Sequence, residues 1–255
     1  MKTLHALPVV LVFTLAPLPA AAQGQEALQL FLAGSYDEAL DCTEDAADAD
    51  SAAFTARVLL AEALSNEVEP ETAVLNRAVE EADRALALQP EHVEGRLQKA
   101  IALSLLARPM SLSQVQKEGR GVEARDLAES VLEDDPHNAY AHAFLSVWNV
   151  EVLRRGGTLG AMMMGASLKK ARRHYEAAGA AMPDDASIHW QWARALAALD
   201  AKKYRKEVEA ALAAAETAAT DSELEGVMQR RAKELDGILS GAGPKAAEVR
   251  ALEML

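Results

Sequence analysis

The sequence predicts an all-α fold built from repeated helix pairs. Aromatic residues make up only 4% of the 255 residues, while alanine, the best helix former, is abundant. Long stretches such as VEAALAAAETAA fit helices and show none of the alternation that marks strands. Half of the residues are hydrophobic, so the chain can bury a substantial core as one domain or one repeat array.

Residues 1–22 are expected to be a cleaved signal peptide. Lys2 precedes an apolar core at 7–18, and the alanines at 20–22 offer a cleavage site before Gln23. The alternative is a membrane anchor, but this core is about a dozen residues long and a crossing needs roughly 20. No later run is long enough to cross a bilayer. We therefore expect an exported protein, soluble after cleavage and periplasmic in a Gram-negative host.

Three similar phrases recur along the chain, and each closes with a proline that can end a helix. ADRALALQPEH, AESVLEDDPHN and YEAAGAAMPDD place Pro90, Pro136 and Pro183 at intervals of 46 and 47 residues. A further helical stretch follows each proline, and an alanine lies 12 residues before each of them. Small residues at fixed places on paired helices let the backbones approach and stack, as a helical solenoid requires.

This repeat resembles the tetratricopeptide repeat (TPR), whose 34-residue pattern reads W-x2-L-G-x2-Y, A-x3-F and P. AGSYDEAL at Ala33–Leu40 is similar to the family's turn and second-helix start. Ala171 with Tyr175 and Pro183 is similar to its second helix and terminal proline. The resemblance covers about Gln25 to Leu199 and implies a right-handed solenoid of about four antiparallel helix pairs.

The pattern is not followed everywhere. Lys99 and Asn149 stand where the family prefers large apolar residues, and every later period exceeds 34 residues. The alternative fold is a helical bundle with coincidental alanine spacing.

The extra length falls at the joint between the two helices of a repeat. The added segments are SNEVEPE, RPMSLSQVQKEGRG and GGTLGAMMMGAS, and the last contains Met162, Met163 and Met164. A solenoid would present all three along one edge, where they could belong to a binding surface or line a pocket. The alternative is that they extend helices or cover neighbouring apolar surface. Lengthened joints also resemble exported bacterial TPR proteins associated with TRAP-type solute transporters.

In TPR proteins the first helix of each unit lines a concave groove. The resemblance implies that six side chains face this groove and could contact a partner: Gln98, Tyr140, Phe144, Trp190, Gln191 and Arg194. Tyr, Trp and Arg are frequent binding anchors because they bury a large area and keep a polar handle. The alternative is that such residues form the core between helices.

A basic cluster follows the methionines in LKKARRHYEAA. It places Lys169, Lys170, Arg172, Arg173 and His174 on the first turns of a helix, where the helix dipole opposes positive charge. The cluster is either a solvated face or the contact for an acidic partner.

Several function classes find no support in the residues. The formal net charge of −13 disfavours nucleic-acid binding. No HExxH, G-x-S-x-G, Walker or GxGxxG motif is present, so no catalytic residue or cofactor is predicted. The candidate metal ligands His137, His142, His174 and His189, like the three methionines, lack metal-site spacing, so no metal is predicted.

Beyond Leu199 two more helices are predicted to cap the solenoid, the second opening with a capping box at Ser222 and Glu225. The repeat domain would span 23–240, and 241–255 would form a flexible tail. The predicted function is that of a non-catalytic binding or scaffolding module for a periplasmic protein or peptide. The alternative is a small-ligand carrier, or a TRAP-transporter-associated component, that encloses an apolar solute.

Overall fold

The structure is a computed structural model that describes residues 22–43, 47–66 and 69–254. These residues form thirteen helices and no strand, which confirms the all-α class. The predicted signal peptide, except for its last residue, lies outside the described residues. In chain order the helices are α1 (Ala22–Leu32), α2 (Tyr36–Asp41), α3 (Ala49–Ser65), α4 (Thr72–Leu88), α5 (Val93–Ala107), α6 (Leu112–Glu118), α7 (Arg120–Asp134), α8 (Ala139–Met163), α9 (Leu168–Ala181), α10 (Ala186–Asp200), α11 (Arg205–Thr217), α12 (Glu223–Gly241) and α13 (Pro244–Glu253).

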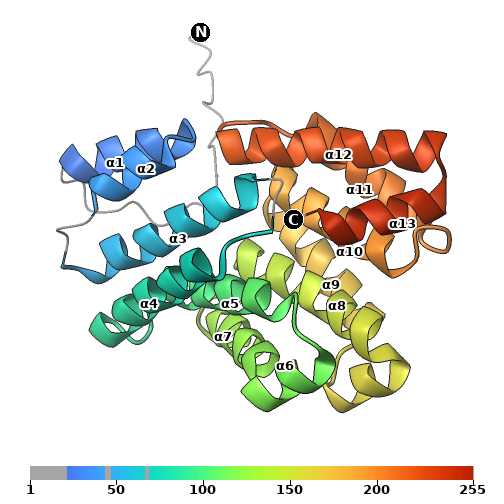
Figure 1. Cartoon of the computed structure of the whole chain (residues 1–255), viewed down its shortest axis with the longest axis horizontal. Helices are drawn as coiled ribbons and strands as arrows, with labels where there is room; N and C mark the ends of the chain where they lie inside the picture. Colours follow the sequence, from blue (N-terminus) through green and yellow to red (C-terminus); the bar gives the residue numbers. More distant parts are fainter. Residues whose placement is uncertain (1–21, 44–46, 67–68, 255) are drawn as a thin grey trace, which may run out of the picture.

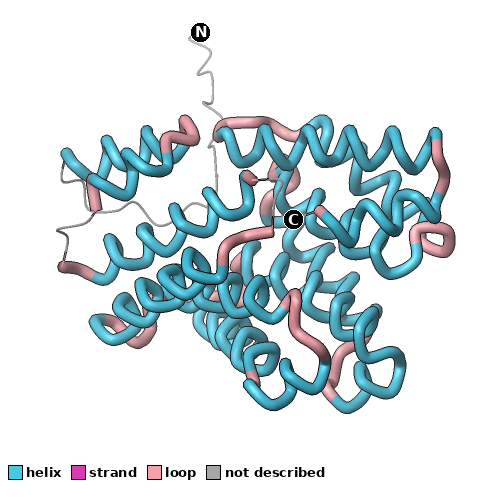
Figure 2. Tube along the Cα trace, in the orientation of Figure 1, coloured by secondary structure: helices cyan, strands magenta, loops and turns pink. Residues whose placement is uncertain are grey.

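Successive helices fold back on one another and stack as pairs (Figure 1). The pairs are α1 with α2, α3 with α4, α5 with α7, α8 with α9, and α10 with α11, followed by α12 with α13. Short loops join the elements along the whole described chain (Figure 2). The result is the predicted helical solenoid, with α6 added at one joint.

The repeated small residues and prolines act as expected. Ala78, Ala124 and Ala171 are fully buried where the second helix of each pair meets its neighbours. In close-packed interiors there is no room for a larger side chain at such positions. Helices α4, α7 and α9 end two residues before Pro90, Pro136 and Pro183, respectively.

Side-chain caps fix most of the helix starts. The Asn138, Ser167 and Asp185 side chains accept hydrogen bonds from backbone N–H groups in the first turns of α8, α9 and α10. At α12 the predicted capping box is confirmed, because Ser222 and Glu225 satisfy each other's backbone donors.

The prediction of a flexible tail at 241–255 is wrong. Residues 244–253 form α13, which packs on α10, and Ala247, Ala251 and Met254 are buried in the main core. In the sequence GAGPK at 241–245, Gly243 turns the chain at φ 91° and Pro244 opens the next helix, a position that proline favours.

The C-terminal helices also close the inner face of the solenoid. Helix α12 contacts both α10 and α3, and α13 runs back toward the centre of the view in Figure 1, where it packs on α10. Arg231 of α12 donates to the carbonyls of Leu64 and Asn66 at 2.7 and 2.9 Å. Arg108, after α5, donates to the carbonyls of Leu252 and Met254 at 2.5 and 2.6 Å. None of the described helices is long and apolar enough to span a bilayer.

Candidate partner-binding surfaces

The expected groove residues lie on the inner helices, but several do not reach solvent. Gln98, Trp190 and Arg194 are 2%, 0% and 8% exposed, while Tyr140, Phe144 and Gln191 are half-buried. Trp190 belongs to the same core cluster as Leu224 and Met228 of α12. The expectation of an open groove is therefore wrong for the three buried residues. Helices α12 and α13 pack on α10, which carries Trp190 and Arg194, whereas Gln98 of α5 bonds to Glu94 of the same helix. A binding role for the six residues stays a prediction.

One half of the inner face holds a buried polar network that the sequence analysis missed. Arg57 of α3 pairs with Glu94 of α5 at 2.6 Å, and both side chains are almost fully buried. Gln98 donates to the same Glu94 carboxylate at 2.7 Å. A charged residue inside the apolar stretch AFTARVLL was the available signal, since buried charges need partners.

Tyr140 and Asp185 form a second buried contact nearby. The Tyr140 hydroxyl donates to the Asp185 carboxylate at 2.9 Å, and Asp185 also caps α10. Burial raises the pKa of both groups, and the Asp185 charge raises the pKa of Tyr140 further. This geometry holds α8 against the start of α10.

The other half of the inner face is rich in arginine. Glu151 accepts from Arg154 at 2.7 Å and lies 3.9 Å from the Arg194 guanidinium. Burial lowers the pKa of Arg194 to about 10. Arg194 therefore serves an internal ion-pair network, with Gln191 accepting from its Nε at 3.1 Å.

The lengthened joints lie along one edge and contact each other. Arg155, directly before the third added segment, donates to the carbonyls of Ala107 and Met110, where the second added segment begins. Trp148 of α8 donates to the Gly121 carbonyl at 2.8 Å, at the end of the second segment. The third segment extends α8 past a kink at Gly157, so the alternative that the added segments lengthen helices holds in part.

The three methionines do not form a pocket with the tryptophans. Met164 packs beside Trp148, whereas Met162 and Met163 are exposed and Trp190 lies in a separate cluster. The five side chains therefore do not line a common pocket.

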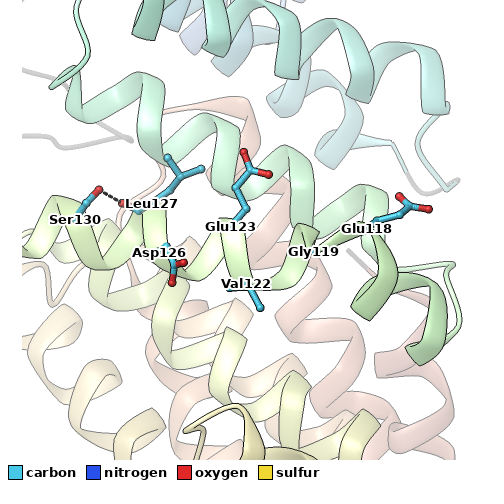
Figure 3. Close-up of a pocket in the computed structure, with 7 residues that line it drawn as sticks. All are labelled: Glu118, Gly119, Val122, Glu123, Asp126, Leu127 and Ser130. Atoms are coloured by element: carbon cyan, nitrogen blue, oxygen red, sulfur yellow. Dashed lines mark hydrogen bonds between the residues drawn. The ribbon is translucent and has the colours of Figure 1, made fainter.

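Among the described residues, two of the hollows that open to solvent bear on function. The first, of about 680 Å³, runs along one face of α7, where Val122 and Leu127 lie among the acidic Glu118, Glu123 and Asp126 (Figure 3). The second, of about 480 Å³, is here called the joint hollow because the first two lengthened joints line it. Its lining residues are Glu69, Pro70, Glu71, Thr72, Leu75, Asn76, Leu105, Leu106, Arg108, Pro109, Met110 and Arg120.

The histidines form hydrogen-bonded pairs rather than a metal centre. His142 and His174 meet with their Nδ1 atoms 2.8 Å apart, and Nε2 of His142 is 3.0 Å from the Pro136 carbonyl. Since the carbonyl can only accept, Nε2 of His142 carries the proton and His174 donates through Nδ1. His189 is held in the same way between the Pro183 carbonyl and the Tyr175 hydroxyl. Among the described residues no group of three or more His, Cys, Asp or Glu could hold a metal ion.

The histidine pair predicts a loss of stability in acid. Burial, the neighbouring His142 imidazole and the charges of Arg173 and Lys170 lower the pKa of His174 to about 4 from an ordinary 6.5. The unfolded chain therefore binds more protons between these values, so stability falls as pH drops from 6.5 toward 4. For this half-exposed group we expect a loss of about 1–2 kcal/mol. Urea midpoints at pH 7.5 and 4.5 should differ less for His174→Asn than for the native chain, and equal differences would contradict the assignment.

No family model matches the sequence, and no curated protein is significantly similar to it. Among solved structures, the chain is similar to a thermophilic TPR protein from Thermus thermophilus. The two share 19% identity with a TM-score of 0.58, over 84% of this chain and 98% of the other. At this identity the likeness shows the fold. The chain is thus TPR-like, an α-helical solenoid of stacked helix pairs.

Proposed function

We propose that the protein is a non-catalytic binding module for another protein or a peptide, working in the exported compartment, which is the periplasm in a Gram-negative host. The TPR-like fold supports a role in protein interaction. The signal-peptide pattern at 1–22 supports export. The absence of catalytic sequence motifs supports a role without chemistry.

The joint hollow is the observation that carries this proposal. The chain's own α12 and α13 pack on α10, and α12 also contacts α3, so we propose that the partner binds at the hollow instead of these inner helices. Leu75 and Leu106 form an apolar floor, and both are buried residues of the repeat core. Charged groups, among them Arg108 and Glu71, surround that floor. An extended segment could insert an apolar side chain and pair its backbone polar groups with the rim.

Two lengthened joints supply most of the wall. Residues 69–71 come from the first added segment, and residues 108–110 with Arg120 come from the second. A repeat of the standard length would lack this extra chain. We therefore propose that the added segments form walls around the hollow at the contact between the helices.

The second candidate is a small-ligand carrier, or a TRAP-transporter-associated component, holding an apolar solute. The volume of about 480 Å³ favours it, because small-ligand pockets commonly measure about 300–1,000 Å³. If the protein is such a carrier, its ligand lies in the joint hollow, away from Met162 and Met163.

The proposal can be tested with a variant in which a large side chain fills the hollow from its rim. Asn76→Trp adds a large side chain at an exposed lining position of α4, and Arg77→Trp adds the same side chain to the adjacent exposed residue outside the lining. Tagged native and variant chains would be used to capture proteins from the exported fraction. We expect Asn76→Trp to lower recovery of specific partners at least about 10-fold and Arg77→Trp to leave it unchanged.

Equal capture by the native chain and Asn76→Trp would show that the joint hollow is not the partner site. Native mass spectrometry of the same proteins distinguishes the second candidate function, the small-ligand carrier, from the binding module. A bound small molecule that is lost in Asn76→Trp and retained in Arg77→Trp would favour the carrier. Circular dichroism confirms that each variant is folded.

A further inference from the structure

The end of α8 presents an apolar face that no described residue covers. Leu159, Met162 and Met163 are 67%, 70% and 75% exposed, the highest values among the large hydrophobic residues described. Their spacing of three and four residues places them on one side of a helical turn. Figure 1 shows this yellow end of α8 at the margin of the molecule, on a convex projection.

The projection is built on fixed contacts. Gly157, at φ 61° and ψ −167°, breaks α8 and redirects its last turns, a conformation that glycine adopts at little cost. On the inner side of the projection, Ala161 packs on Trp148. The backbone closes with Ala166 N–H donating to the Ala161 carbonyl at 2.8 Å. The apolar face is therefore held outward while the backbone behind it is satisfied.

Positive charge is concentrated on both sides of this face along the sequence, in an otherwise acidic chain. Between Glu151 and Glu176 the sequence carries six basic residues and no acid: Arg154, Arg155, Lys169, Lys170, Arg172 and Arg173. Arg154 and Arg172 pair with Glu151 and Glu207, and Arg155 binds main-chain carbonyls. Lys170 donates to the Gly165 carbonyl at 2.6 Å, which holds its ammonium group beside the projection. Lys169, Lys170 and Arg173 are exposed on the first turns of α9, directly after the projection.

We infer that this tip, formed by Leu159, Met162, Met163, Lys169, Lys170 and Arg173, docks on an anionic lipid surface. Apolar side chains that enter the headgroup region beside lysines and arginines are the features that bind peripheral proteins to such membranes. The net charge of the chain does not prevent this, because salt screens charges more than about 8–10 Å away.

A lipid surface fits the tip better than a protein partner does. A stable protein interface needs about 20–30 residues a side, whereas the tip offers three apolar side chains and three cations on a convex turn. A fluid surface can adapt to such a small projection. The inference goes beyond the proposed function and does not depend on the joint hollow.

The test uses a fluorescent label that reports polarity at one position of the full chain. Cys42 is the only cysteine, so Cys42→Ser with Met163→Cys gives a single labelling site on the tip. A matched chain carries the label at Lys206→Cys, an exposed site on α11. All chains keep the same first 22 residues, so any binding by that segment is common to them.

Vesicles of phosphatidylcholine with phosphatidylglycerol should shift the emission of the label at 163 to the blue, while phosphatidylcholine alone should not. The label at 206 should not respond to either. Neutralising Lys169, Lys170 and Arg173 together to glutamine should weaken binding to the anionic vesicles about 100-fold, with an unchanged thermal midpoint. Leu159→Gln with Met162→Gln should also abolish the shift.

A label at 163 that stays in water with anionic vesicles would overturn the inference. So would a blue shift that depends on protein concentration instead of lipid, since it would assign the tip to self-association. Equal shifts at 163 and 206 would likewise overturn it, because the label would then report general adsorption.

Discussion

Trp190→Ala is expected to lower the free energy of unfolding by about 3–5 kcal/mol, because it leaves a cavity in the centre of the core. Trp190 is fully buried in the cluster that joins α10 to α12. Urea unfolding followed by circular dichroism would measure the loss. The result also separates two roles for this residue, since a groove residue that faced solvent would change binding with little effect on stability.

Gln191→Ala supplies the control for that experiment. Gln191 is the next residue of α10, is half-buried, and accepts one hydrogen bond from Arg194. Its removal should cost about 1 kcal/mol. If Trp190→Ala cost no more than Gln191→Ala, the closed inner face would be refuted.

Arg57→Met is expected to destabilise the protein by about 3–5 kcal/mol, because it leaves the buried Glu94 carboxylate without its cation. Gln98 remains as a donor to that carboxylate but carries no charge. The double variant Arg57→Met with Glu94→Met should recover much of the loss, since an apolar pair of similar volume needs no ionic partner. Chemical denaturation of the native chain, both single variants and the double variant gives the coupling energy.

If the free-energy losses of the two single variants simply add up in the double variant, Arg57 and Glu94 do not stabilise each other as a buried ion pair. The pair connects α3 to α5 across 37 residues of sequence. An exposed pair such as Arg205 with Glu209 gives the contrast, and its removal should cost about 0.3–0.5 kcal/mol.

The repeat could be predicted because its signals are local. Pro136 and Pro183 end helices wherever the chain goes next, and Ala124 and Ala171 mark close helix contacts that the structure confirms. The place of α13 could not be predicted in the same way. Pro244 signals both the end of one helix and the start of another, and only the packing of Ala247 and Ala251 on the core decides between them.

The candidate surfaces could also be predicted only where their signals are local. The sequence identified the added segments, and the bonds from Arg155 to Ala107 and Met110 bring the second and third joints together. It did not identify the cover over Trp190, because that contact joins segments that are far apart in the chain. The meeting of His142 and His174 could not be predicted for the same reason, because the two residues lie 32 positions apart on different helices.

The bonds from Arg231 to residues 64 and 66 give this solenoid a kinetic property that open repeat arrays lack. In an open array each unit contacts only its neighbours, so folding can begin anywhere and the ends can fray separately. Here contacts between residues 167 positions apart must close before the structure is complete. Contacts over such a long sequence separation slow folding. We expect the two ends to melt in one transition instead of unravelling unit by unit.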